Sequence, residues 1–219
     1  MRRKREFPLV MAGLTAVALV FLLVCLLIGK LLDGRRYYDQ DFGFEPYISS
    51  TDANGDGIDD QTEILEQAKK YVASKPSYRS EYYETGYPVG DCGVCTDVVG
   101  YAMLHSGYDL MKLVHEDVLA VPEAYPKAAD ERIDFRRVVN LEVWFKRHAA
   151  YDLTTDIYQI DQWEGGDIVL FPGHIGVVSD RRNRKGIPYI IHHGRPGQQE
   201  YEEDILEGRD DVTGHYRMS

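Results

Sequence analysis

The sequence has few cysteines and little positive charge beyond its N-terminus. Its three cysteines are Cys25, Cys92 and Cys95, and Cys25 lies inside an apolar run, so a disulfide-rich framework is excluded. Residues 1–36 hold seven of the 25 Lys and Arg and two of the 36 Asp and Glu, which leaves 18 basic and 34 acidic residues, a net charge of −16. Because nucleic-acid binding depends on neutralising phosphates, this charge argues against a nucleic-acid partner.

Charged residues are also missing between Pro8 and Gly29, where the chain is almost entirely apolar. About 20 residues at a rise of ~1.5 Å each can cross a hydrocarbon core of ~30 Å. A buried helix of a soluble domain would show a polar face, and this segment shows none. The pattern predicts a cytoplasmic basic flank over residues 1–7 and a transmembrane helix over 8–32.

The flanks of this run predict its direction in the membrane. The preceding residues are more basic than the following ones, which favours a cytoplasmic N-terminus and an extracellular C-terminal domain. The run is longer than the apolar region of a usual signal peptide, and no A-x-A-like cleavage site follows it. We therefore expect a single-pass anchored protein rather than a secreted one.

Apolar spacing then organises the rest of the chain. Residues 33–51 lack clear periodicity and are predicted to be a linker. Helical spacing is found over residues 60–73, from about 96 to 107, and over 110–119 and 141–148. Short Ile- and Val-rich runs at 167–170, 174–179 and 188–192 predict strands, the last two as a hairpin. Helices followed by sequential strands predict an α+β domain with an antiparallel sheet.

Cys95 lies where a Gly-rich turn meets a predicted helix. The unsatisfied N–H groups and the positive dipole end of a helix N-terminus favour the thiolate, which is the reactive form of cysteine. Taken alone, a cysteine at this place is also typical of a small core residue. A catalytic role would require a base nearby and a third group that orients the base.

Two histidines are candidates for those roles. His174 opens one predicted strand and His192 closes the next. If the two strands pair as a hairpin, both side chains can lie on one face, where His192 would hold the imidazole of His174 in one tautomer. A helix packed on that sheet would bring Cys95 to them.

The order of these motifs resembles that of the NlpC-type cysteine hydrolases, papain-like enzymes of bacterial cell walls. The chain resembles most closely an uncharacterised bacterial branch of that clan, and the resemblance runs from about Tyr78 to the C-terminus. The shared motifs are GVCTDV at 93–98, DxRRVxNL at 134–141, GHIGVV at 173–178, Ile-His at 191–192 and GHYR at 214–217.

The resemblance implies a papain-like fold over residues 78–219, with helices packed on an antiparallel sheet. It implies that Cys95 is the nucleophile, His174 the general base and His192 the third residue of an enzyme that cleaves an amide bond. Peptidoglycan stem peptides are the expected substrates, and no cofactor is needed for catalysis. The chain departs from the branch at Cys92 and at His193, where the branch usually has Asn, so either His192 or His193 can be the orienting group; we favour His192.

Further residues are candidates for the substrate cleft. They are Tyr83, Asp97, Arg136, Arg137, Asn140 and His193. Arg136, Arg137 and Asn140 can equally form a structural network with the many carboxylates. Arg217 in the terminal motif is expected to be structural.

Two other functions are compatible with the sequence. Cys92-x-x-Cys95 at a helix start is the arrangement used by thiol–disulfide oxidoreductases, although residues 82–91 suggest a turn where that fold needs a strand. A Cys₂His₂ zinc site is a related alternative. The chain can also be a non-catalytic surface module that binds cell-wall peptide or a partner protein.

Residues 52–63 match a calcium-binding EF-hand loop, followed by a helix in the segment 52–77. The oxygen ligands at the required positions are Asp52, Asn54, Asp56, the Ile58 carbonyl, Asp60 and Glu63. Gly57 occupies the position of the sharp turn. Because no convincing helix precedes the loop, the pattern indicates one structural Ca²⁺ rather than a paired sensor.

Overall fold

The computed structural model describes residues 6–33 and 35–219, which form two units, Met1–Arg36 and Tyr37–Ser219. Helix α1 (Glu6–Asp33) belongs to the first unit. Within the described residues, no helix combines the length and hydrophobicity needed to cross a bilayer. The predicted flank over 1–7 and part of the predicted span over 8–32 lie outside the residues whose side chains are described.

Five helices follow in the second unit. They are α2 (Asp60–Ala73), α3 (Cys95–His105), α4 (Leu110–Ala120), α5 (Glu131–Asp134) and α6 (Val138–His148). Asp59 caps α2 by accepting a hydrogen bond of 3.2 Å from the Thr62 amide, which satisfies one of the unpaired N–H groups of the first turn. Helices α2, α3, α4 and α6 confirm the helices predicted at 60–73, 96–107, 110–119 and 141–148. The prediction was possible because the apolar residues of these segments repeat at helical spacing.

The main sheet has seven strands in the order β4-β9-β5-β6-β7-β8, with β1 paired to β6. These strands are β1 (Tyr37–Tyr38), β4 (Tyr151–Asp152), β5 (Ile168–Phe171), β6 (His174–Arg182), β7 (Pro188–Ile191), β8 (Glu202–Glu203) and β9 (Gly214–Arg217). All of its pairs are antiparallel. The predicted antiparallel sheet and the β6–β7 hairpin are therefore confirmed.

Two short strand pairs, one in the main sheet and one separate from it, were not predicted from the sequence. Tyr37 and Tyr38 pair with Arg182 and Arg181, so part of the predicted linker over 33–51 belongs to the domain. A separate parallel pair joins β2 (Ser77–Tyr78) to β3 (Cys92–Gly93), directly before α3. Strands of two residues are too short to show an alternating pattern, which explains why the sequence did not predict them.

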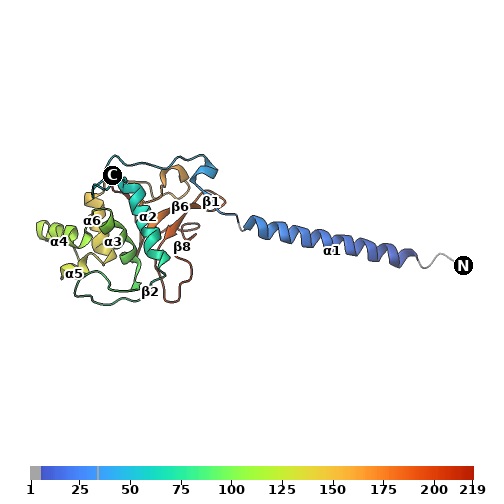
Figure 1. Ribbon diagram of the computed structural model, residues 1–219, viewed down its shortest axis with the longest axis horizontal. Coiled ribbons are helices and arrows are strands. Elements are labelled where there is room, and N and C mark those ends of the chain that lie inside the picture. Colours follow the sequence, from blue (N-terminus) through green and yellow to red (C-terminus); the bar gives the residue numbers. More distant parts are fainter. Residues whose placement is uncertain (1–5, 34) are drawn as a thin grey trace. The chain divides into compact units, whose positions relative to one another are not determined.

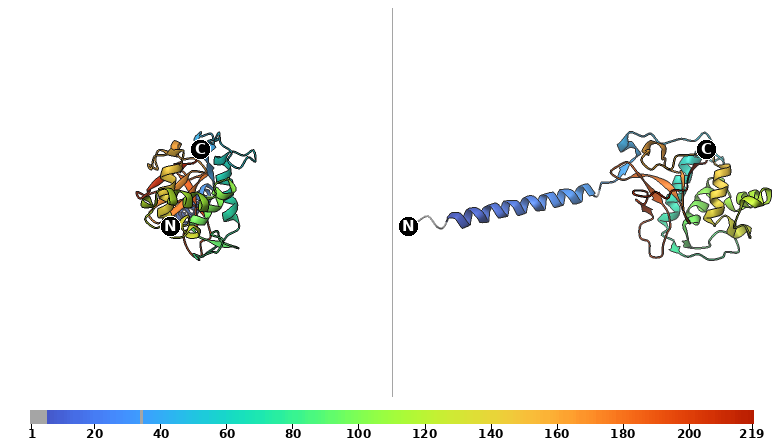
Figure 2. Two further views of the ribbon diagram at one scale, coloured as in Figure 1. Left: turned by 90° about the vertical axis from the view of Figure 1, so that its left-hand side faces the viewer. Right: turned by 180° about the vertical axis from the view of Figure 1, so that it is seen from behind.

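The helices lie on one side of the domain and the strands on the other, as both Figure 1 and Figure 2 show. Alternate residues of β5 enter two different cores. Ile168 and Leu170 join the core that the sheet shares with the helices, whereas Val169 and Phe171 join a smaller core with Trp163. This separation of helices from an antiparallel sheet is the α+β architecture predicted from the sequence.

A largely buried polar cluster joins Asp167, the residue before β5, to β9. The Nε2 of His215 lies 3.0 Å from Asp167 Oδ2, and Arg217 donates to both Asp167 oxygens at 2.7 and 2.8 Å. Gln61 of α2 donates to Asp167 Oδ1 at 2.9 Å, and the Trp163 ring stacks on His215 with 3.8 Å between centroids. The terminal GHYR motif thus supplies two side chains that fix α2 and β9 to the sheet.

Candidate active site

Cys95 is the first residue of α3, and its backbone is held by the residues around it. Asp97 Oδ2 accepts a hydrogen bond of 2.8 Å from the Val94 amide, which closes the first turn of the helix. A Cβ atom at Gly93 would lie 2.2 Å from the Tyr71 hydroxyl, so only glycine fits before the turn. The glycine and the aspartate of the GVCTDV motif therefore fix where the cysteine enters the helix.

The two candidate histidines are in direct contact. The Nε2 of His174 lies 3.0 Å from the Nδ1 of His192, and the rings are nearly perpendicular at 89°. The pairing of Val177 with Ile191 across β6 and β7 places both histidines on one face of the hairpin. The side-by-side placement expected from the sequence is observed.

The sulfur of Cys95 lies at the beginning of β6, next to the backbone of Ile175. The backbone amide of Ile175, the residue after His174, donates a hydrogen bond to the sulfur, as does the amide of Thr96. Helix α3 packs directly on β6. The structure thus brings Cys95 to the strand that begins with His174, although the two residues are separated by almost 80 positions in the sequence.

The electrostatics differ from the expectation for a helix N-terminus. Burial raises the pKa of the Cys95 thiol, and the surrounding amides offset this only in part. Burial, followed by the neighbouring His192 and Arg209, lowers the pKa of His174 to about 4. At neutral pH the resting pair is therefore a thiol and a neutral imidazole, in which the imidazole is free to accept a proton.

Glu203 in β8 is a member of this site that the sequence did not predict. Its Oε2 lies 3.0 Å from the Nε2 of His192, and Arg195 donates to both of its oxygens at 2.9 and 2.6 Å. Glu203 stands in an acidic run with Glu202 and Asp204, so nothing in its local sequence separates it from a solvated side chain. Only the pairing of β8 with β7 brings it to His192.

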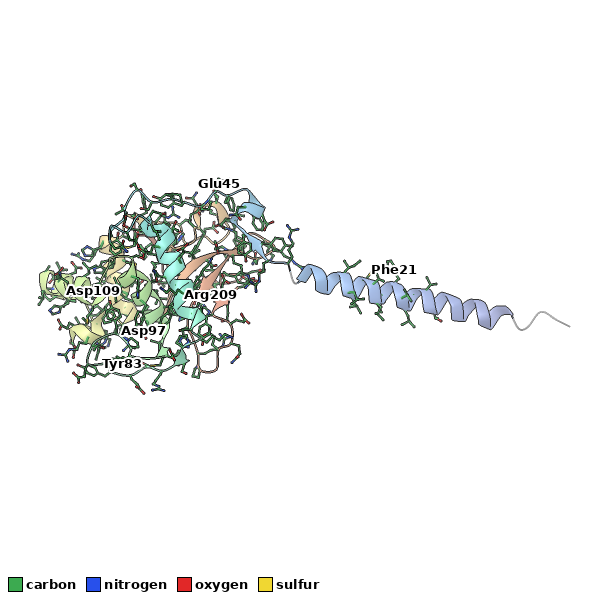
Figure 3. The ribbon with its side chains drawn as sticks, viewed as in Figure 1. Phe21, Glu45, Tyr83, Asp97, Asp109 and Arg209 are labelled. Atoms are coloured by element: carbon green, nitrogen blue, oxygen red, sulfur yellow. The ribbon has the colours of Figure 1, made fainter. Side chains whose placement is uncertain are left out.

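Three of the predicted cleft residues, Asp97, Arg136 and Tyr83, form one cluster at the start of α3. Arg136 donates to both Asp97 oxygens at 2.7 and 2.9 Å, and their side chains are 6% and 0% exposed. The guanidinium also lies 4.8 Å from the centroid of the Tyr83 ring; Asp97 and Tyr83 are labelled in Figure 3. These contacts favour the structural role for Arg136.

Arg137 and Asn140 contact a different part of the chain. Arg137 donates to the carbonyl of Lys127, and the buried Asn140 donates to the carbonyl of Asp134 at 3.1 Å. Both side chains therefore support the segment between α4 and α6. Of the two alternatives left by the sequence, the structural network accounts for these contacts.

His193 follows His192 in the sequence, but its ring contacts two tyrosines. Its ring is 1% exposed and packs edge-on against Tyr78 and Tyr201, with 5.2 and 5.0 Å between centroids. Its Nδ1 has no hydrogen-bond partner among the described residues. His193 lines a cavity of about 360 Å³ between β2 and the loop after β7, together with Lys75 and Gln198. The cavity lining includes His193, the residue after His192, and Tyr78, which pairs with Gly93 in β3.

Most of the chain is similar in sequence to known proteins. Residues 65–218 match a protein family described as a domain of unknown function, DUF1287. The chain belongs to the DUF1287 family. It is also 40% identical over 168 residues to the uncharacterized protein YijF of Escherichia coli (strain K12), a match that covers 70% of this chain and 80% of the relative. No solved structure gives a significant match.

The DUF1287 match contains the whole candidate site. It begins inside α2 and ends at Met218, one residue after the GHYR motif, so Cys95, His174, His192 and Glu203 all lie within it. The acidic loop over 52–63 precedes the match. The candidate active site is therefore part of the family domain, and the loop lies before the matched residues.

The acidic loop gathers most of its predicted ligands around one turn. Asp52 accepts hydrogen bonds from the amides of Gly55 and Gly57 at 2.7 and 2.8 Å, and Asn54 donates to Glu63 at 2.9 Å. Burial, then the charges of Asp56 and Asp52, raise the pKa of Glu63. Among the residues that the structure describes, no group of three or more His, Cys, Asp or Glu is arranged to hold a metal.

Both carboxylate oxygens of Asp60 already have hydrogen-bond donors. Its oxygens accept hydrogen bonds from the Ala53 amide at 2.8 Å and from the Tyr108 hydroxyl at 2.5 Å. Asn54 also donates to the carbonyl of His105 at 2.8 Å, which joins the loop to the C-terminal end of α3. The loop thus contacts the helix that carries Cys95, and it also contacts the preceding segment, because Asp59 accepts a hydrogen bond of 2.9 Å from the Ser49 amide.

Replacing Arg136 by leucine tests its structural role. We expect the free energy of unfolding to fall by about 3–5 kcal/mol, because the fully buried Asp97 carboxylate would lose its ion-pair partner. Urea unfolding followed by circular dichroism measures this change. The exposed Arg79→Leu variant, which removes an ion pair with Glu81 at 3.6 Å, is the control and should change stability by less than about 1 kcal/mol. Full stability of Arg136→Leu would favour the substrate-cleft role instead.

Proposed function

We propose that this domain is a cysteine hydrolase that cleaves an amide bond, with Cys95 as nucleophile, His174 as general base and His192 as the residue that orients the base. The observation that carries the proposal is the 3.0 Å contact between His174 and His192 at the point where β6 meets the start of α3. A sulfur beside the backbone of β6, a neutral imidazole at the start of that strand and an orienting polar group in contact with the imidazole are the parts that thiol-based acyl transfer requires.

In the proposed mechanism, His174 takes the thiol proton of Cys95 as the sulfur attacks the substrate carbonyl. The amides of Ile175 and Thr96, which already donate to the sulfur, stabilise the negative charge that proton transfer creates. Backbone N–H groups at the start of α3, including that of Cys95, stabilise the oxyanion. His174 then protonates the leaving amine, and a water molecule activated by the same histidine releases the acyl group.

The substrate class is proposed from the resemblance to the NlpC-type hydrolases, whose papain-like fold we also propose here. Peptidoglycan stem peptides are short and extended, and the cavity of about 360 Å³ lined by Lys75, Tyr78 and His193 can accept one of their side groups. In the same proposal, residues 8–32 anchor the chain in the cell membrane, the N-terminus is cytoplasmic and the domain is extracellular.

The proposed function is tested by incubating purified full-length protein with intact peptidoglycan and with synthetic stem peptides. New amine groups and released fragments, identified by mass spectrometry, would support the proposal and identify the bond. If no amide is cleaved, the surface-binding module becomes the better account. If activity instead requires a disulfide substrate and both Cys92 and Cys95, the protein is an oxidoreductase. In the structure, Cys92 is buried and its sulfur lies 3.2 Å from the Tyr83 hydroxyl.

We further propose that the acidic loop binds one structural Ca²⁺. Asp52, Asn54, Asp56, the Ile58 carbonyl and Glu63 supply the hard oxygen ligands that Ca²⁺ prefers, and the cation would offset the repulsion between Glu63 and the carboxylates of Asp56 and Asp52. The orientation of Asp60 toward Tyr108 and Ala53 does not fit the sixth predicted ligand. In this role calcium supplies rigidity to the turn that supports α3 and takes no part in the reaction.

Calcium should therefore raise the thermal unfolding midpoint. At a concentration 100 times the dissociation constant, the stabilisation is about 2.7 kcal/mol, and chelation with EGTA should remove it. Differential scanning calorimetry with and without Ca²⁺ measures the shift. Glu63→Gln should abolish the shift, whereas Glu66→Gln, at an exposed position one turn along the same helix, should keep it. An equal shift in both variants would contradict the calcium site.

A further inference from the structure

Glu203 extends the two histidines into a chain of four side chains. The first contact joins His174 Nε2 to His192 Nδ1 at 3.0 Å, and the second joins His192 Nε2 to Glu203 Oε2 at 3.0 Å. Arg195 closes the chain with its two hydrogen bonds to Glu203. The pairing of Glu203 with Ile190 in the sheet fixes the carboxylate beside the end of β7, where His192 follows.

The chemistry of these partners decides where the protons lie. The hydrogen bond from Arg195 lowers the pKa of Glu203, so the carboxylate is ionised at neutral pH and can only accept. The Nε2 of His192 must therefore donate. Burial lowers the pKa of His192 and keeps its ring neutral, which leaves Nδ1 as an acceptor. The Nε2 of His174 must then donate to it, and the Nδ1 of His174 carries no proton.

We propose that Glu203, held by Arg195, is a positioning residue that sets the tautomers of both histidines so that His174 presents an unprotonated Nδ1 to Cys95. The inference rests on the proposed function, since it assigns how the base of that reaction is prepared. As His174 takes the Cys95 proton, its Nε2–H bond to His192 becomes charge-assisted and therefore stronger. The ionised Glu203 stabilises the resulting imidazolium through His192.

An amide at position 203 would remove this control. A glutamine side chain can donate an N–H to the Nε2 of His192, in which case the His192 proton moves to Nδ1. His174 would then accept at Nε2 and carry its own proton on Nδ1, the nitrogen that must act as base. A neutral side chain of almost the same size therefore selects the wrong tautomer without removing any atom from the site.

The test compares Glu203→Gln with Glu202→Gln, its neighbour in β8. The Glu202 carboxylate accepts a hydrogen bond from Ser179 and lies 3.6 Å from Arg181, so the same change there leaves the His192 contact in place. Imidazole ¹⁵N chemical shifts of full-length protein report the tautomers. The alkylation rate of Cys95 by iodoacetamide is measured by mass spectrometry in a Cys92→Ser background. This rate reports how well His174 acts as the base for Cys95.

We expect wild type and Glu202→Gln to protonate His192 at Nε2, and Glu203→Gln to lose that tautomer and react about 10- to 100-fold more slowly. Arg195→Gln, a change at an exposed side chain that leaves the sheet intact, should cause a smaller loss in the same direction. Wild-type tautomers and rates in Glu203→Gln would overturn the inference. A wild-type rate that does not depend on His174 would overturn the proposed function, while the ¹⁵N shifts would still decide the role of Glu203.

Discussion

Cys95→Ala should eliminate cleavage of any amide substrate, with a loss of roughly 10⁴-fold or more in turnover, because no other group can form the acyl intermediate. The change removes one partly exposed sulfur atom at a helix start, so the fold should persist. Turnover is measured as the release of amine from the stem peptide that wild type cleaves, and folding by circular dichroism.

Cys92→Ser is the matched control for that experiment. Its side chain contacts the Tyr83 hydroxyl and lies in the strand before α3, so the substitution keeps a polar group of similar size at the same distance from Cys95. We expect Cys92→Ser to retain most of the activity. Equal losses in the two variants would point to a reaction that uses both sulfurs, and retained activity in Cys95→Ala would exclude the proposed mechanism.

Asp167→Asn should cause the largest loss of stability among single substitutions in the sheet. The buried carboxylate is the common partner of Arg217, His215 and Gln61, and an amide cannot accept from all of them. Leaving the buried Arg217 without its counter-charge should lower the free energy of unfolding by about 3–5 kcal/mol. Because β5 pairs with β6, the same variant should also loosen the strand that begins with His174.

The pH dependence of stability gives this prediction a second test. Burial raises the pKa of Asp167, but the hydrogen bonds from His215 and Arg217 outweigh it, and the folded-state pKa lies below the usual value. The carboxylate therefore stabilises the fold above about pH 4 and loses this effect as the pH falls through the lower folded-state pKa.

Urea unfolding between pH 3 and pH 7 should accordingly show a steeper loss of stability in acid for wild type than for Asp167→Asn. Asp161→Asn, at an exposed position in the loop before β5, is the control and should follow the wild-type curve. If the Asp167→Asn curve ran parallel to that of wild type at all pH values, the ionised carboxylate would not be the source of the stabilisation.

The sequence was sufficient to predict the parts of the fold that have long periodic patterns. Helix α2 coincides with the predicted range 60–73, and the hairpin of β6 and β7 was predicted from two Ile- and Val-rich runs. The contact between His174 and His192 followed from that hairpin, because the pairing of Val177 with Ile191 places both histidines on the same face of the two strands. The central pair of the candidate site was thus accessible from local information.

The remainder of the site depends on contacts between distant segments. The carboxylate of Glu203 reaches His192 only through a strand of two residues, which has no sequence pattern of its own. The ion pair between Asp97 and Arg136 joins residues 39 positions apart. The direction of the Cys95 pKa shift was wrong in the sequence-based expectation, because the helix N-terminus is a local feature whereas burial is set by packing against β6.

The central claim is that His174 is the base for Cys95. The most direct test is the alkylation rate of Cys95 at pH 6, measured by mass spectrometry in a Cys92→Ser background with and without His174→Ala. At this pH an isolated thiol with a raised pKa is almost unreactive, while His174, with a pKa of about 4, is neutral and can accept the proton. We expect His174→Ala to slow alkylation roughly 100-fold. Equal rates with and without His174 would contradict the account.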